Sequence, residues 1–237
     1  MKETHLHHHH HEPHANSSDV LRDIVIGMSD GLTVPFALAA GLSGAVNGTS
    51  VIILAGVAEI AAGSIAMGLG GYLAGTTETD HYNSELKREY YEVEHLAEIE
   101  KDEVRKIFRE WGLSKDVQEK AVHEITNNKD HWVDFMMKHE LGLSEPDPKR
   151  ARKSAFNIGF SYIVGGLVPL SPYFFTNNSI EGLKFSVIIT LICLFIFGYF
   201  KSKLTGVNPL TGGLKVMMIG AAAAATAFAI TKFIESR

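Results

Sequence analysis

The sequence predicts an all-α membrane protein with five transmembrane helices and a three-helix cytosolic insert between the second and third spans. Apolar runs recur five times, each near the roughly 20 helical residues that a bilayer requires. Charge is concentrated in one block, because residues 76–150 hold 19 of the 27 acidic and 12 of the 22 basic side chains. A membrane part interrupted by a soluble part explains this division better than a uniformly mixed globule.

The division gives four segments. Residues 1–18 are rich in histidine and lack apolar periodicity, so they are predicted to be disordered. Their five consecutive histidines, His7 to His11, are either a native tract that binds a transition metal weakly or an affinity tag. The other segments are the first two spans (19–75), the cytosolic helical insert (76–148) and the last three spans (149–237).

The first span is expected over 19–46, started by Ser18 or Asp19 as a helix cap and kinked at Pro35. A tight turn at 47–50 precedes the second span, 51–75. Neither proline nor a turn cluster follows this span. The pattern therefore predicts one continuous helix from Val51 to Glu110, about 90 Å long at ~1.5 Å per residue.

The rest of the insert has clear punctuation. Gly112 is expected to end the long helix, and Ser114 to cap a second helix over 115–127. A third helix is expected over 129–141. Three further apolar runs, at about 153–175, 183–200 and 210–234, complete the five spans.

The basic residues indicate the orientation. Most lie on one face of the membrane if the N-terminus and the insert are cytosolic and the C-terminus is on the far side. The net charge of −5 resides in the insert, which argues against a nucleic-acid partner. Cys193 is the only cysteine, which excludes an intrachain disulfide and a cysteine-type zinc site.

Two acids lie inside the predicted spans. Asp30 is roughly 16 Å into the first span and Glu59 roughly 12 Å into the second, entered from the other face. An ionised acid there costs on the order of 2.5–3.5 kcal/mol, so it usually faces a cavity, a partner or an ion. The alternative is an acid satisfied by hydrogen bonds or by a proton. Met67, at nearly the depth of Asp30, is either a soft metal ligand or a packing residue.

A second group of acids lies in the insert. Glu89, Glu92, Glu100 and Glu103 form two Glu-x-x-Glu pairs eleven residues apart, which places them on one stripe of a continuous helix. The stripe is either a solvated face or a site for Mg²⁺, Ca²⁺, Mn²⁺ or Fe²⁺. Met136 and Glu140 could add ligands from the third helix, with Met136 favouring a transition metal. Four histidines are further candidates: His95, His123, His131 and His139.

At these positions the chain resembles the vacuolar iron transporter family, in its plant type with a cytosolic metal-binding domain. The resemblance covers most of 19–237 and is strongest in SDGLTVPFALAAGL (29–42) and AEIAAGSIAMGLGGYLA (58–74). It implies five spans, a homodimer, and movement of Fe²⁺, in some members Mn²⁺, from cytosol to vacuole in exchange for protons. It also implies a translocation path formed by Asp30, Glu59 and Met67. It likewise implies a soluble metal site formed by Glu89, Glu92, Glu100, Glu103, Met136 and Glu140.

The resulting hypothesis is a proton-coupled divalent-metal transporter of the vacuolar membrane, not an enzyme. It is expected to handle Fe²⁺, with Mn²⁺, Zn²⁺ or Co²⁺ as alternatives, and to need no prosthetic group. One rival is a membrane-anchored di-iron carboxylate ferroxidase, suggested by the Glu-x-x-His motif of Glu92 and His95. Such a site requires two of these motifs on facing helices, and the sequence contains one. A metal sensor without transport is the other alternative.

Overall fold

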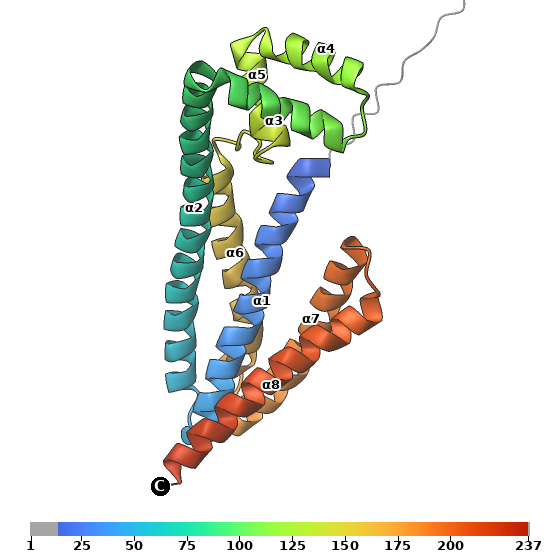
Figure 1. Ribbon diagram of the computed structural model, residues 1–237. Coiled ribbons are helices and arrows are strands. Elements are labelled where there is room, and N and C mark those ends of the chain that lie inside the picture. Colours follow the sequence, from blue (N-terminus) through green and yellow to red (C-terminus); the bar gives the residue numbers. More distant parts are fainter. Residues whose placement is uncertain (1–13, 237) are drawn as a thin grey trace, which may run out of the picture. The chain divides into compact units, whose positions relative to one another are not determined.

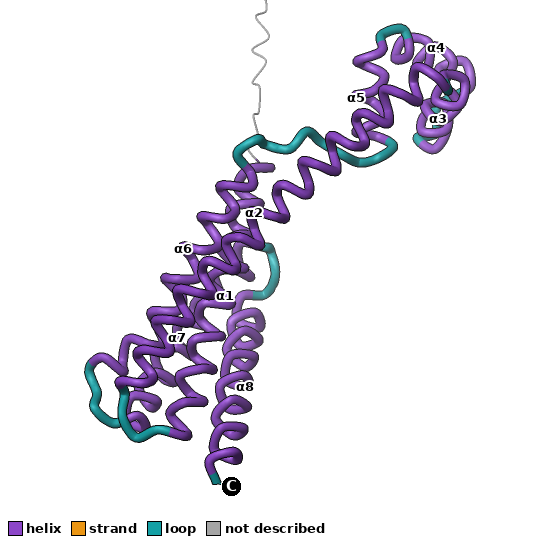
Figure 2. Tube along the Cα trace, turned by 90° about the vertical axis from the view of Figure 1, so that its left-hand side faces the viewer, coloured by secondary structure: helices purple, strands orange, loops and turns teal. Residues whose placement is uncertain are grey.

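The computed structural model describes residues 14–236, and its regular elements are all helical (Figures 1 and 2). In chain order the helices are α1 (His14–Ala45), α2 (Ser50–His95), α3 (Ala97–Glu110), α4 (Lys115–Thr126), α5 (Lys129–His139), α6 (Arg150–Leu170), the short 3-10 helix η1 (Ser171–Phe174), α7 (Ser179–Leu204) and α8 (Pro209–Glu235).

Five of the helical segments are long and apolar enough to cross a membrane: α1, α2, α6 with η1, α7 and α8. The shorter helices α3, α4 and α5 lie between the second and third of these segments. The predicted fold class is therefore confirmed.

The chain divides into two compact units. One, which we call the membrane unit, holds the chain up to Tyr72 and from Arg152 onward. The other, which we call the soluble unit, is Leu73–Ala151. Helix α2 belongs to both, because the boundary falls within it.

The membrane unit is closed at one end by contacts between two turns that are distant in sequence. Gly48 pairs with Asn178 in an isolated antiparallel bridge. Thr49 Oγ1 donates a hydrogen bond to the carbonyl of Thr176 at 3.0 Å. These bonds hold the α1–α2 turn against the segment that precedes α7. Beside them lies an apolar cluster of buried side chains from α1, α2, α6 and η1: Ala39, Ile52, Ile60, Leu170 and Tyr173.

The soluble unit has its own hydrophobic core, and its helix ends follow the sequence only in part, because Ser114, the predicted cap, precedes α4 without a side-chain capping hydrogen bond. Gly112 adopts a φ of +82° directly after α3, a conformation that costs glycine little. Asn128 caps α5 by accepting a hydrogen bond from the backbone amide of His131 at 3.0 Å. The core is formed by α2 to α5: Val93, Val104, Phe108, Val122, Trp132, Val133, Met136 and Met137.

The prediction of one continuous helix from Val51 to Glu110 is wrong. The helix breaks at Leu96, whose backbone lies at φ −124° and ψ 29°, and α3 begins at Ala97. Neither proline nor glycine causes the break. Core packing accounts for it, because Val104 and Phe108 of α3 are buried with Val93 of α2. Burying each such side chain contributes roughly 1.5–3 kcal/mol, more than the few hydrogen bonds lost at one break.

The predicted N-terminal boundary is also displaced. Helix α1 begins at His14, so the backbone of residues 14–18, predicted to be disordered, is helical, and neither Ser18 nor Asp19 caps its start. A helix that has formed adds further residues at little cost, which explains the extension. The histidine tract His7 to His11 lies outside the described residues.

Candidate metal centre and membrane carboxylates

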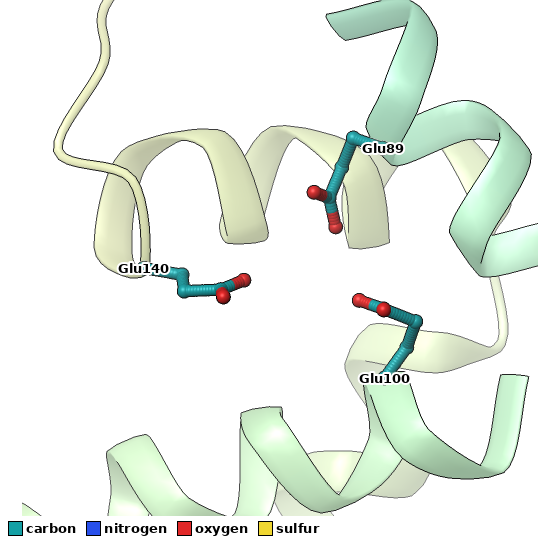
Figure 3. Close-up of side chains that lie close together, drawn as sticks. All are labelled: Glu89, Glu100 and Glu140. Atoms are coloured by element: carbon teal, nitrogen blue, oxygen red, sulfur yellow. The ribbon is translucent and has the colours of Figure 1, made fainter. Parts of the chain in front are cut away.

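Three carboxylates of the soluble unit converge on one point. Glu89 of α2, Glu100 of α3 and Glu140 at the end of α5 each place a carboxylate oxygen within 4.8 Å of the others. Figure 3 shows the three side chains pointing toward one another from three different helices. In one unbroken helix Glu89 and Glu100 would be about 16 Å apart. The break at Leu96 is therefore what brings them together.

This group, which we call the acidic cluster, has unsatisfied oxygen atoms. Glu89 and Glu100 are only 1% and 3% exposed, while Glu140 is open to solvent. Glu89 Oε1 and Glu100 Oε2 are buried and have no hydrogen-bond partner in the structure. Buried polar atoms are normally paired, so orphaned carboxylate oxygens that face one another fit a divalent cation.

The electrostatics of the acidic cluster favour a bound proton or a cation. Burial, followed by the charge of Glu140, raises the pKa of Glu89 to about 7. Burial, followed by the charge of Glu89, raises the pKa of Glu100 to about 8. The carboxyl groups of Glu89 and Glu100 are buried close together, so a proton on either one reduces the repulsion between them. Burial and Glu103 also raise the pKa of Glu140.

The other predicted ligands of the insert lie around this cluster. Glu92 and Glu103 act on it electrostatically but are outside the close group. Glu92 is also 3.6 Å from the Arg88 Nε, a weak ion pair along α2. Met136 is fully buried in the core one turn before Glu140.

Within the described residues no histidine joins the acidic cluster. The ring of His95 stacks on Tyr91, at 4.1 Å between centroids, and its Nδ1 lies 2.9 Å from the Tyr91 carbonyl oxygen. His139 packs against Phe135 and Trp111. His123 and His131 are exposed and also lie outside the group.

The predicted membrane acids are half-buried in a single chain. Asp30 lies on α1, and Glu59 and Met67 lie on α2. No lysine or arginine of the described chain forms an ion pair with Asp30 or Glu59. Met67 is eight residues beyond Glu59, about 12 Å along the helix, so these two side chains are not neighbours.

A tyrosine that the sequence analysis missed holds the second membrane acid. Tyr162 of α6 donates a hydrogen bond from its hydroxyl to Glu59 Oε1, whereas Glu59 Oε2 is buried without a partner. The ring of Tyr162 is almost wholly buried, and Asp30 lies within its electrostatic range. One side chain of α6 therefore holds the acid of α2, and Asp30 of α1 contributes to the electrostatic environment of the same phenol. A phenol in an otherwise apolar run was the available signal.

Two glycines allow α1 and α2 to approach this tyrosine. A Cβ atom at Gly31 would overlap the backbone of Tyr162, and one at Gly63 would overlap its hydroxyl. Gly31 directly follows Asp30, and Gly63 lies one turn after Glu59. The absence of side chains at both positions therefore sets the spacing of the two acids around Tyr162.

A third acid of the membrane unit was also missed. Asp23 of α1 is 1% exposed and accepts a hydrogen bond from the Ser154 hydroxyl of α6 at 3.0 Å. It precedes Asp30 by two helical turns, so both face the same side of α1. That spacing in the sequence was the signal.

Five candidate membrane-spanning segments with carboxylates inside two of them, joined to a soluble unit that carries an acidic cluster, are the features of a cation transporter. The comparisons agree, because the model of the VIT family matches residues 21–232. The chain therefore belongs to the VIT family, and it is a transporter rather than an enzyme.

Its relatives include vacuolar iron transporters from plants and a yeast protein. The chain is 50% identical over 225 residues to vacuolar iron transporter 1 of Tulipa gesneriana, covering 95% of this chain and 91% of the relative. It is 48% identical over 234 residues to vacuolar iron transporter 1 of Arabidopsis thaliana, covering 99% and 93%. It is 37% identical over 223 residues to protein CCC1 of Saccharomyces cerevisiae, covering 91% and 69%.

Proposed function

We propose that the protein moves Fe²⁺ from the cytosol into the vacuole in exchange for protons. The observation that carries this proposal is the carboxylate of Glu59. One oxygen is held by Tyr162, the other is buried without a partner, and no basic side chain of residues 14–236 forms an ion pair with it. Such an acid inside a membrane can hold a proton or a metal ion in turn. Iron as the transported metal and the vacuole as its destination are inferred from the names of the plant relatives.

The acidic cluster is the proposed collecting site for the metal. Carboxylates are hard ligands that suit Fe²⁺ and Mn²⁺, and Zn²⁺ or Co²⁺ could replace them. Glu89, Glu100 and Glu140 provide the close ligands, and Glu92 and Glu103 add negative charge around them. Met136 lies one turn from Glu140, and its thioether would favour a transition metal if it turned toward the site.

Proton exchange at the acidic cluster follows from its pKa values. A carboxylate must lose its proton before it binds a metal. With pKa values of about 7 and 8, Glu89 and Glu100 are partly protonated near neutral pH, so binding a metal releases protons. The site therefore binds tightly in a neutral cytosol and weakly wherever the pH falls.

The proposed translocation path uses Asp30, Glu59 and Met67. Metal reaching the two carboxylates would displace their protons, and protons from the acidic vacuole would then displace the metal. Tyr162 orients Glu59 throughout by donating its hydroxyl proton to one oxygen. The thioether of Met67, about 12 Å along α2 from Glu59 and near the depth of Asp30, would offer the metal a softer ligand.

The proposed location is the vacuolar membrane, crossed five times. The N-terminus and the insert are cytosolic and the C-terminus is lumenal, because most of the basic residues that border the spans then face the cytosol. They are Arg22, Lys149, Arg150, Arg152, Lys153, Lys201, Lys203 and Lys215, against Lys184, Lys232 and Arg237 on the lumenal side.

We further propose that the working form is a homodimer. Asp30 is only half-buried in a single chain, although it lies well inside a span. A carboxylate that faces lipid costs on the order of 2.5–3.5 kcal/mol, and a second copy packed over α1 would remove that contact.

The acidic cluster does not support the alternative of a di-iron oxidase. That site needed His95 beside Glu92 as a ligand, but His95 stacks on Tyr91 and lies outside the cluster. Three glutamates without a histidine suit reversible binding of a cargo ion.

The test is Fe²⁺ uptake by proteoliposomes that are acidic inside. Glu59→Gln keeps the size of the side chain and its hydrogen bond from Tyr162 but cannot exchange a proton. We expect uptake to fall to the level of empty liposomes. Glu181→Gln changes an exposed acid at the start of α7 and should transport normally. Normal uptake by Glu59→Gln would contradict the proposal.

A further inference from the structure

A cavity of about 410 Å³ lies between the end of α7 and the start of α8, with an apolar wall that carries several polar side chains. It is separate from the acidic cluster and from the membrane acids. Two lysines, Lys201 of α7 and Lys215 of α8, contribute to its wall. The remaining polar lining consists of uncharged side chains: Ser202, Thr205, Asn208 and Thr211. No acidic side chain lines it.

The two lysines have no counter-charge in the structure. Neither amine forms an ion pair or a hydrogen bond with a described residue. The sequence contains no Asp or Glu between Gly182 and Ile234, a stretch that holds five lysines. The segment that forms the cavity therefore cannot neutralise it, and an anion from outside would.

One hydroxyl at this cavity also has no hydrogen-bond partner among the described residues. Ser202 is 7% exposed, and its Oγ makes no hydrogen bond to a described residue. Asn208 Oδ1 is already occupied, because it accepts from the amides of Leu210 and Thr211 at 3.0 and 3.3 Å. The start of α8 is thus capped by its own side chain. What remains for a ligand is two ammonium groups, the Ser202 hydroxyl and the Asn208 amide, all of which can donate hydrogen bonds.

The surroundings of the cavity are those of a membrane boundary. Both α7 and α8 are membrane-spanning segments, and the cavity lies where one ends and the next begins. Large apolar side chains beside it are exposed in the single chain, as expected for surfaces covered by acyl chains. They include Phe200, Leu204, Leu214 and Met218, each at least half exposed.

We propose that this cavity binds the phosphate-bearing headgroup of an anionic phospholipid. The lysines neutralise the phosphate, Ser202 and Asn208 donate to its oxygens, and the acyl chains lie along the exposed apolar surface of α7 and α8. Four crossings precede this turn, which places it on the same side of the membrane as the N-terminus. In the proposed orientation that side is the cytosolic leaflet, which carries anionic lipids. The proposal concerns lipid binding and does not depend on which metal is transported.

The test compares lipid binding by the purified full-length protein and its variants. Native mass spectrometry measures the binding of phosphatidylinositol, phosphatidylserine and phosphatidylcholine to each. The double variant Lys201→Gln/Lys215→Gln should bind the two anionic lipids about 25-fold more weakly, at about five-fold for each lysine near the surface. Phosphatidylcholine should bind weakly to every form.

Lys203→Gln is the matched control, because Lys203 carries the same charge two residues from Lys201 but does not line the cavity. It should bind anionic lipids as the wild type does. Lys201→Arg/Lys215→Arg keeps both charges and should also retain binding, which separates loss of charge from misfolding.

Three outcomes would overturn the proposal. The first is an equal loss of lipid binding in the Lys203→Gln control and the double Gln variant. The second is no loss of lipid binding in either variant. The third is displacement of the lipid by inorganic phosphate or soluble inositol phosphate at similar concentrations. That result would show that the cavity takes a free anion and that the acyl chains contribute nothing.

Discussion

Replacing Glu100 with Gln should weaken metal binding by the acidic cluster and remove most of its pH dependence. The raised pKa values of Glu89 and Glu100, about 7 and about 8, mean that protons compete with the metal below these values. The affinity of the wild type therefore rises with pH through this window. Lowering the pH from 8 to 6 should weaken its apparent affinity by about 500-fold, as expected when two such protons must leave.

Glutamine has a similar size but binds no competing proton. In Glu100→Gln at most one such proton remains, on Glu89, and losing the charge of Glu100 removes a cause of its raised pKa. The same change of pH should then weaken binding by about ten-fold or less. Binding at pH 8 should also be weaker than in the wild type, because one of three charged ligands is lost.

The assay is isothermal titration calorimetry with Mn²⁺ and, anaerobically, with Fe²⁺ at pH 6, 7 and 8. Repeating it in buffers of different ionisation enthalpy counts the protons released per metal. Glu98→Gln is the control, since Glu98 lies on the same helix but is exposed and paired with Lys101 at 2.8 Å. Equal proton release by the wild type and Glu100→Gln would refute the assignment of these pKa values to metal ligands.

Three further results are expected. Metal-free protein should become less stable as the pH rises from 5 to 8, because Glu89 and Glu100, whose pKa values are raised in the folded state, bind more protons there than in the unfolded state. Thermal unfolding of the soluble unit measures this change, and a rise in stability over that pH range would contradict it. Asp30→Ala should abolish Fe²⁺ uptake with helicity by circular dichroism retained, and normal uptake would remove Asp30 from the path. Tyr162→Phe should slow uptake by about 10–100-fold, the worth of one hydrogen bond to a charged group, while metal binding by the acidic cluster stays unchanged; an unchanged rate would mean that Tyr162 does not position Glu59.

The helices and the two sets of acids could be predicted because their signals are local. Apolar length predicted the five spans, and Gly112 predicted the end of the insert helix that closes at Glu110. Asp30 and Glu59 stand out as charges in apolar runs. Each of these inferences needs only neighbouring residues and the periodicity of a helix.

The break at Leu96 could not be predicted, because its cause is tertiary. No residue there disfavours a helix, and the gain comes from burying Val104 and Phe108 against the rest of the core. The stripe drawn for a straight helix was therefore geometrically wrong, although Glu89 and Glu100 do belong together. For the same reason Glu92 and Glu103 are peripheral to the close cluster.

The contact between Tyr162 and Glu59 could not be predicted either, because it joins two spans that are distant in the sequence. The two residues are 103 positions apart, and the approach depends on Gly31 and Gly63. A single sequence gives no indication of which spans pack together. Only the three-dimensional arrangement shows that α1 and α2 meet at one phenol of α6.

The central claim is that metal and protons alternate on carboxylates inside the membrane. The most direct measurement records Fe²⁺ entry and proton exit together in proteoliposomes that are acidic inside, for the wild type and Glu59→Gln. The account predicts proton exit that begins on addition of Fe²⁺, keeps a fixed ratio to metal entry, and is absent in the variant. Fe²⁺ entry without any proton exit would contradict it.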